Sequence, residues 1–220
     1  MSEALEDLRV APVKRAEDDV ADIVIVSGAS IVQIRKQVGF GPYSLLAQNG
    51  NDAYFVPDEQ AWRNELTWIQ KFAVFKLVER LLKVSGESVG DSLYKVEDRG
   101  CQISYSATGH KAPIELKKAY DPDGSVRKNV IDDDLEWFNE MGIHGIKYAI
   151  GGTTCIDFYT HTKGENVARF VGEMGWRPDE CVYVGDALFE GGNDATVIGV
   201  VPTVAVEGPE DTLRVIKSFL

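Results

Sequence analysis

The sequence lacks the features that would place it at a membrane, in an oxidising compartment or on nucleic acid. No apolar run approaches the length of a membrane span, and the N-terminus has no charged-then-apolar secretory signal. Its three cysteines are odd in number and show no metal or redox spacing, which indicates small buried side chains in a reducing compartment. Positive charge is scarce, because 23 Lys and Arg face 35 Asp and Glu for a net charge of −12. This charge argues against nucleic acid or anionic lipid as partners, and the expected location is the cytoplasm.

What is present is ordinary globular composition. The 220 residues are 44% apolar and 26% charged, which is enough to build a core in one domain with an insertion or in two small domains. The negative net charge does not exclude a small phosphorylated ligand, because a cationic side chain or a metal ion at the binding site outweighs the electrostatic potential of the whole protein there.

The pattern of the first part of the chain predicts a βαβ unit. Residues 23–26 are a continuous β-branched run that predicts a buried strand, and residues 31–38 predict a short helix. Residues 43–47 predict a second strand that ends at Gln48-Asn49-Gly50. Strand, helix and strand in this order predict a parallel α/β sheet.

The pattern changes in the middle of the chain and then returns. Residues 57–160 predict an inserted α+β module with helical spacing in 62–84, alternation in 94–106, a helix in 126–141 and two strands within 146–159. The α/β core then resumes over 161–220, with an amphipathic helix at 163–175, strands at 181–184 and 200–206, and a helix at 209–220. We therefore divide the chain into a core made of residues 1–56 and 161–220 and a cap made of residues 57–160.

The most informative loop follows the strand at 181–184. It places Asp186 directly after a glycine and brings Asn193 and Asp194 after two more glycines. Open α/β sheets bind ligands at the carboxyl ends of their strands, and carboxylate and amide oxygens suit Mg²⁺. The alternative is a tight turn whose acids face solvent.

Two further positions suit a phosphate group. Ser27 follows the first strand and offers a hydroxyl beside the backbone N–H groups of Gly28 and Ala29. The alternative for Ser27 is a helix cap. Lys163 opens a helix and supplies a compact positive charge, although a lone lysine is usually a solvated surface residue.

Taken together, Ser27-Gly28, Lys163-Gly164, Gly185-Asp186 and Gly192-Asn193-Asp194 resemble the haloacid dehalogenase (HAD) superfamily. Gln48-Asn49-Gly50 and the segments 99–110 and 151–157 resemble its class IIB branch of phosphomannomutases and sugar-phosphate phosphatases. The resemblance covers residues from about 22 to 220 and implies a HAD-like core with an inserted α+β cap.

The resemblance also implies roles. Ser27, Gly28, Ala29 and Lys163 would hold the transferring phosphoryl group, and Asp186 would bind Mg²⁺ with Asn193 and Asp194 as further ligands or supports. In the cap, Arg99 and Asp157 would contact the substrate. His110 stands where phosphomannomutases carry a second arginine, which weakens a sugar-bisphosphate interpretation.

The superfamily's nucleophile is the main departure. It is the first Asp of an Asp-x-Asp-Gly-Thr motif on the strand that would precede Ser27, and no such motif lies there. The parallel sheet would therefore lack its first strand. Either the chain is N-terminally truncated, which we favour because a gap in a sheet is costly, or it kept the phosphate pocket and lost turnover.

We therefore expect a Mg²⁺-dependent sugar-phosphate phosphatase of the HAD class IIB type, in a truncated form with little or no turnover. The alternatives are a phosphomannomutase-like phosphotransferase and a non-catalytic protein that binds a phosphorylated ligand or regulates a partner. The expected partner is a small phosphorylated sugar, and a homodimer is left open.

Overall fold

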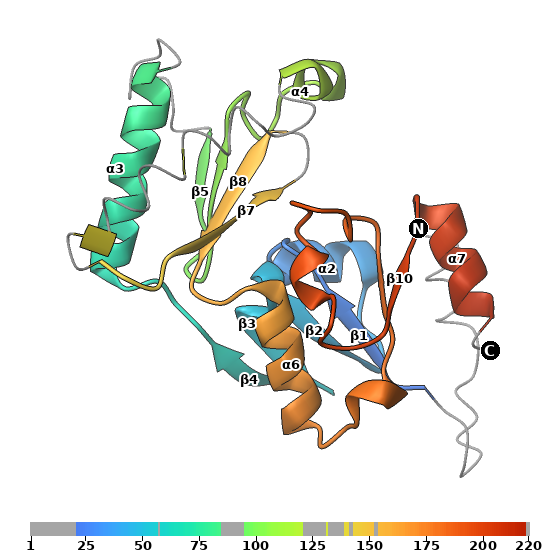
Figure 1. The fold of residues 1–220 in the computed structure, drawn as a ribbon. Helices are drawn as coiled ribbons and strands as arrows, with labels where there is room; N and C mark the ends of the chain where they lie inside the picture. The colour runs from blue at the N-terminus through green and yellow to red at the C-terminus, as the bar shows by residue number, and fades with distance from the viewer. Residues whose placement is uncertain are drawn as a thin grey trace. The chain divides into compact units, whose positions relative to one another are not determined.

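The computed structural model describes residues 21–56, 58–84, 95–120, 131, 139–140, 143–151 and 154–218. The chain divides into two compact units (Figure 1). The first unit contains residues 1–63, 163–190 and 194–220, and the second contains residues 64–162 and 191–193. No helix in the described ranges is both long and apolar enough to cross a membrane.

The first unit begins with the βαβ element that the sequence predicts. Strand β1 (Ile23–Val26), helix α2 (Ile31–Val38) and strand β2 (Tyr43–Ala47) have the predicted bounds, and β1 pairs with β2 in parallel. A 3₁₀ turn, η1 (Gln48–Gly50), leads into the antiparallel strands β3 (Asp52–Phe55) and β4 (Glu59–Arg63). The sheet order is β1-β2-β3-β4.

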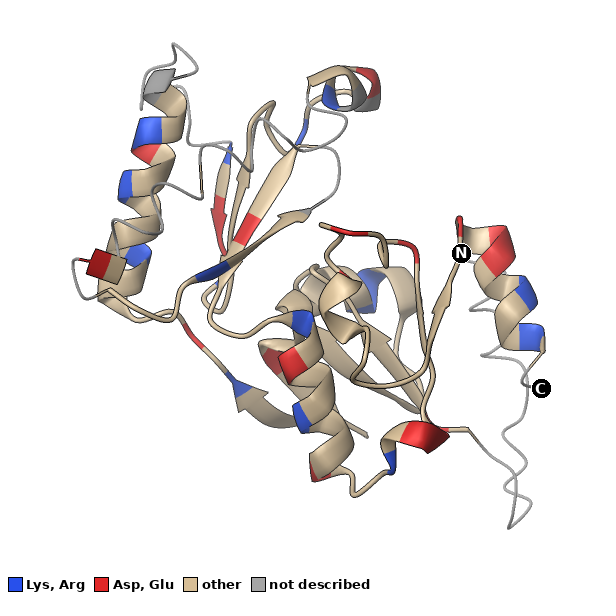
Figure 2. Ribbon diagram, in the orientation of Figure 1, with Lys and Arg blue, Asp and Glu red and all other residues tan. Residues whose placement is uncertain are grey.

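The chain returns to the first unit at helix α6 (Lys163–Glu173). Strands β9 (Tyr183–Gly185) and β10 (Thr203–Ala205) pair in parallel, and helix α7 (Pro209–Lys217) follows. Two further 3₁₀ turns, η3 (Pro178–Glu180) and η4 (Ala195–Val197), flank β9. The acidic first turn and basic last turn of α7 are visible in Figure 2 and match the dipole of a helix.

The parallel sheet of this unit is in two hydrogen-bonded pieces. Among the described residues, β1 pairs only with β2 and β9 only with β10. All four residues of β1 are half-buried, whereas four of the five in β2 are buried. Parallel strands are normally buried on both faces and rich in β-branched residues. Strand β1 has that composition, but its side chains are only half-buried.

Two apolar clusters cover the two faces of the first sheet. Leu46 of β2 packs with Val167 and Phe170 of α6, while its neighbour Leu45 packs with Ile34 of α2. The split follows from the period of two in a strand, which sends successive side chains to opposite faces. Each helix therefore holds the sheet through one set of alternate side chains.

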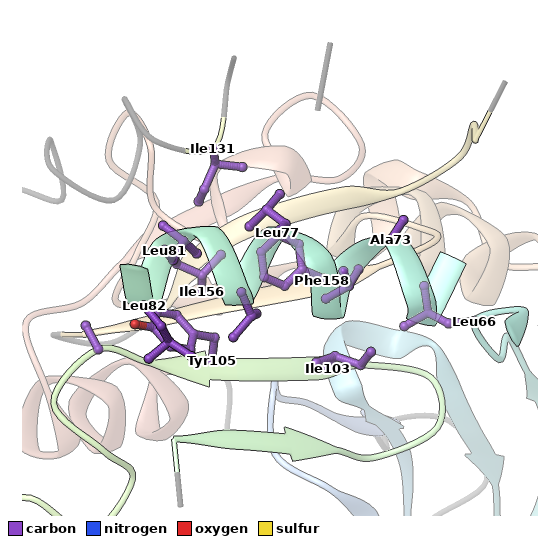
Figure 3. Packing of buried hydrophobic residues seen from close by; sticks show 13 residues of the cluster. Leu66, Ala73, Leu77, Leu81, Leu82, Ile103, Tyr105, Ile131, Ile156 and Phe158 are labelled. Atoms are coloured by element: carbon purple, nitrogen blue, oxygen red, sulfur yellow. The ribbon is translucent and has the colours of Figure 1, made fainter. Parts of the chain in front are cut away.

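The second unit is an antiparallel sheet packed on a long helix. Strands β5 (Val96–Asp98), β6 (Ile103–Ser106), β7 (Lys147–Gly151) and β8 (Cys155–Tyr159) have the order β5-β6-β8-β7. Helix α3 (Trp68–Val84) packs against one face through Leu77 and its neighbours, as Figure 3 shows. Helix α4 (Ile114–Tyr120) follows β6. The polar side chains of the strands lie on the other face.

The structure confirms the α/β fold class and corrects four details. The helix expected from residue 62 begins at Trp68, because Trp62 belongs to β4 and donates its indole N–H to the Gly50 carbonyl (2.8 Å). The hairpin of β3 and β4 and helix α4 were not predicted. The strand expected at 181–184 is β9, shifted toward its glycine. The helix predicted over 126–141 lies almost wholly outside the described residues.

Candidate functional site

Ser27 lies directly after β1, in a turn that its own side chain stabilises. Its Oγ accepts the Ala29 N–H (3.1 Å), and its backbone N–H donates to the Leu46 carbonyl (3.0 Å). The N-cap of α2 is Ser30, whose Oγ accepts the Gln33 N–H in a complete capping box. Ser27 is therefore not the helix cap, and the alternative of a simple cap is wrong.

Replacing Ser30 with alanine should destabilise α2, because the capping box loses one of its two hydrogen bonds. We expect the free energy of unfolding to fall by about 1 kcal/mol, measured by urea titration. Ser27→Ala is the matched control, since its Oγ makes one short-range hydrogen bond within a turn. An equal loss in both variants would contradict the assignment of the cap.

The turn η1 lies beside the Ser27 loop. The Asn49 N–H donates to the Ser27 carbonyl (2.9 Å) and the Gln48 N–H donates to the Ala29 carbonyl (2.9 Å). Gln48 and Asn49 have positive φ angles of 51° and 57°, although neither is glycine. Such backbone strain persists where surrounding contacts enforce it and is concentrated at functional sites.

Asn166 of α6 holds this turn in place. Its Nδ2 donates to the Asn49 carbonyl (2.9 Å), and a Cβ on Gly50 would come within 2.5 Å of the Asn166 Cβ. Lys163 lies one helical turn before Asn166 and on the same side of α6. Hydrogen bonds therefore run from Ser27 through Asn49 to the helix that begins with Lys163. Asn166 could not be predicted as a site residue, because its only signal in the sequence was its spacing of three from Lys163.

Lys163 and Asp194 form a buried ion pair. The Lys163 ammonium donates to Asp194 Oδ1, and the two side chains are each 5% exposed. Asp194 Oδ1 also accepts the Tyr183 hydroxyl (2.8 Å), and its Oδ2 accepts the Ala187 N–H (3.2 Å). Burial, followed by the charge and hydrogen bond of Asp194, raises the pKa of Tyr183, so this hydroxyl stays a donor.

Gly185 makes room for this carboxylate. A Cβ there would come within 2.5 Å of Asp194 Oδ2. Asp194 is thus surrounded by donors from α6, β9 and the loop after β9. The structure brings together Lys163 and Asp194, two residues that the sequence analysis had assigned to different tasks.

Asp186 follows β9 and is exposed. Figure 2 shows acidic residues along this loop. Asn193 is half-buried and belongs to the compact unit that contains the cap sheet. No group of three His, Cys, Asp or Glu that could hold a metal occurs in the described part of the chain. Asp186 offers an exposed carboxylate, the kind of ligand that Mg²⁺ accepts when phosphate and water supply the others.

The cap residues named from the sequence gather around β6. Arg99 donates from Nε to Glu97 Oε2 (3.1 Å), and Asp157 Oδ1 accepts the Ser104 hydroxyl (2.6 Å). His110 Nε2 lies 3.3 Å from the Ser104 carbonyl oxygen. The sequence analysis did not single out Glu97 or Ser104, because alternation identifies the face of a strand but not the residues opposite it.

The chain is similar to one known protein family and to several solved structures. The family model for eukaryotic phosphomannomutases matches residues 19–220. No curated protein sequence matches the chain. Several solved structures share the fold at low sequence identity.

Three of these structures are phosphatases or nucleotidases by name. The IMP-nucleotidase of Plasmodium falciparum is 14% identical with a TM-score of 0.69 over 100% of this chain and 57% of its own. The sucrose-phosphatase of Synechocystis is 18% identical, with a TM-score of 0.54 over 99% and 82% of the two chains. A HAD superfamily phosphatase of Bacteroides thetaiotaomicron is 11% identical, with a TM-score of 0.56 over 99% and 85%. The chain spans little more than half the length of the IMP-nucleotidase.

Proposed function

Since the chain belongs to the eukaryotic phosphomannomutase family, we propose that it binds a small phosphorylated sugar through the phosphoryl site of a HAD phosphatase. The observation that carries the proposal is the hydrogen-bonded path from Ser27 through Asn49 to α6. It places a hydroxyl, backbone N–H groups and the lysine-bearing start of a helix in one unit. Such groups neutralise the oxygens of a phosphoryl group.

In this site the Ser27 hydroxyl and the backbone N–H of Gly28 donate hydrogen bonds to phosphate oxygens. The Ala29 N–H, which donates to Ser27 Oγ in this structure, exchanges that acceptor for a phosphate oxygen. Lys163 supplies positive charge, and one of its three N–H donors is already used by Asp194. Asp194 then positions the lysine, because its own oxygens are occupied by Lys163, Tyr183 and Ala187. Mg²⁺ held by Asp186 would add positive charge beside the phosphate when bound.

The proposed substrate is a sugar phosphate. The predicted cap of residues 57–160, without the β4 strand that belongs to the first unit, is proposed to act as a substrate cap. This proposal is supported by the name of the matched family and by the ligands named for two structural relatives. The IMP-nucleotidase is described with IMP bound, and the sucrose-phosphatase with sucrose and phosphate.

The three cysteines are free, in keeping with a cytoplasmic location.

Turnover by residues 1–220 alone should be slow, because no Asp-x-Asp-Gly-Thr motif precedes Ser27. The leading activity is phosphomonoester hydrolysis, with phosphomannomutase-like transfer as the second candidate. A non-catalytic phosphate binder is the third candidate. A colorimetric phosphate assay on a sugar-phosphate panel separates these: rapid turnover would contradict the argument from the motif.

The decisive test is Mg²⁺-dependent phosphate binding. Asp186→Asn should weaken Mg²⁺-dependent binding of mannose 6-phosphate by about tenfold or more in isothermal titration calorimetry, because it removes the carboxylate proposed to hold the ion. Glu190→Gln is the matched control, since Glu190 is also exposed on the same loop. Equal effects of the two variants, or binding that ignores Mg²⁺, would overturn the metal assignment.

A further inference from the structure

The turn η1 departs from two rules of local structure in one place. Gln48, Asn49 and Gly50 have successive φ angles of 51°, 57° and 84°, and only the last of them is glycine. Residues with a Cβ avoid this left-handed region because the Cβ approaches the following carbonyl oxygen. Gln48 is 2% exposed, and its Oε1 is buried without a hydrogen-bond partner in the described part of the chain. Both departures persist only where surrounding contacts impose them, so the turn serves more than local stability.

The left-handed turn directs two backbone N–H groups onto the Ser27 loop. The Asn49 N–H donates to the Ser27 carbonyl and the Gln48 N–H donates to the Ala29 carbonyl, both at 2.9 Å. A trans peptide unit is planar, and its C=O and N–H point in opposite directions. Since the Ser27 carbonyl points toward η1, the N–H of Gly28 points away from it. The turn therefore sets the direction of an N–H group that the proposed site uses for phosphate.

Asn166 fixes this turn to helix α6. Its Nδ2 donates to the Asn49 carbonyl (2.9 Å), and the residue is 1% exposed. Gly50 passes so close to the helix that a Cβ there would lie 2.5 Å from the Asn166 Cβ and 3.1 Å from its Cγ. Breaking a buried hydrogen bond leaves its acceptor without water or partner, which is costly. The turn is therefore held against α6 both by a hydrogen bond and by packing.

Lys163 belongs to the same stretch of α6. Residues three apart on a helix are neighbours, so the Lys163 and Asn166 side chains leave adjacent turns on one side. The helix thus carries the lysine directly and holds the Ser27 loop through Asn166 and Asn49. Groups that bind one ligand together must be held within about 0.5 Å of their productive positions. In this chain that spacing depends on a single side-chain amide.

From these contacts we infer that Asn166 is a positioning residue of the phosphoryl site. Through η1 it holds the Ser27 hydroxyl and the Gly28 N–H at a fixed spacing from Lys163, so that all three bind the same phosphate. The alternative is a purely structural amide that satisfies a buried carbonyl. The inference rests on the proposed function and concerns only residues of the first unit.

A double-mutant cycle in phosphate affinity separates these two roles. Inorganic phosphate is titrated into the full chain by isothermal titration calorimetry with Mg²⁺ present. Asn166→Ala should weaken binding about tenfold, because the Ser27 loop loses its spacing from Lys163. Ser27→Ala should weaken binding about fivefold in the wild-type chain but less than about twofold in Asn166→Ala, where the displaced hydroxyl no longer reaches the phosphate. A purely structural amide would leave the two losses additive.

Trp62→Phe is the matched control. The Trp62 indole also donates to a carbonyl of η1, that of Gly50 (2.8 Å), but it comes from β4 rather than from α6. The variant removes a hydrogen bond of the same kind and leaves the link between η1 and Lys163 intact, so the phosphate affinity should stay within about twofold of wild type. Circular dichroism checks that each variant is folded. Asn166→Ser, which keeps a shorter polar side chain, replaces Asn166→Ala in the cycle if the latter unfolds.

Every outcome decides between the two roles or reaches the proposed function. Non-additive losses in Asn166→Ala and Ser27→Ala, with no loss in Trp62→Phe, support the inference. Unchanged affinity in Asn166→Ala, additive losses, or an equal loss in Trp62→Phe overturn it while leaving phosphate binding by the wild-type chain intact. Failure of the wild-type chain to bind phosphate overturns the proposed function itself, and the inference with it.

Discussion

Replacing Gly164 with alanine should destabilise the first unit by about 3 kcal/mol or more. A Cβ at this position would come within 1.9 Å of the Thr196 carbonyl oxygen and 2.5 Å of its carbonyl carbon. Both are backbone atoms, so no side-chain rotation relieves the overlap. The Gly164 N–H also donates to Thr196 Oγ1 (3.0 Å), and a shift of α6 away from η4 would break this hydrogen bond. Urea unfolding followed by circular dichroism measures the loss.

The same helix supplies the control. Gly172 lies in α6 and is exposed, and no atom lies within 4 Å of a Cβ built there. Gly172→Ala should therefore stabilise the protein by about 0.5 kcal/mol through helix propensity. The two substitutions are chemically identical and differ only in surroundings. Destabilisation of similar size in both would show that α6 does not pack against η4 as described.

The first βαβ element could be predicted to the residue because several local signals agree. The β-branched run of β1 requires a strand, and the capping box of Ser30 and Gln33 fixes the start of α2. The hairpin of β3 and β4 gave no such signal. Asp52 opens β3 fully buried, and its carboxylate accepts from Arg63 (2.8 Å) and Gln60 (3.0 Å). A buried charge on a strand breaks the hydropathy pattern that predicts strands, and its partners lie on the paired strand β4, which strand register brings beside it.

The candidate site shows the same limit. Ser27, Lys163 and Asp186 could be identified from the sequence one by one, because each lies at the end of a predicted strand or the start of a predicted helix. The sequence could not show that Lys163 and Asp194 meet, because this depends on how α6 packs beside the loop after β9. Nor could it show that Glu97, Ser104 and Asp157 lie opposite one another, which depends on strand register. Pairing across strands and helices is set by tertiary packing, for which spacing in sequence is a weak guide.

The second large effect concerns the buried ion pair. Lys163→Met should lower the free energy of unfolding by about 3–5 kcal/mol, because it leaves the Asp194 carboxylate buried without its cation. Asp194→Asn in the same chain should restore part of that loss. The asparagine still offers an oxygen to the Tyr183 hydroxyl but carries no charge that needs a partner. Urea unfolding of the single and double variants gives the coupling energy of the pair.

An exposed pair on the same unit serves as the control for this cycle. Arg177 and Asp179 are 69% and 65% exposed, so Arg177→Met should change the free energy of unfolding by less than about 1 kcal/mol. If Lys163→Met costs no more than Arg177→Met, the lysine is solvated and the buried pair is refuted. If the loss of unfolding free energy in the double variant equals the sum of the losses in Lys163→Met and Asp194→Asn, the two residues act independently. Only strong coupling is consistent with Asp194 holding Lys163 in position for a phosphate, because a positioning contact must bind its partner in the absence of ligand.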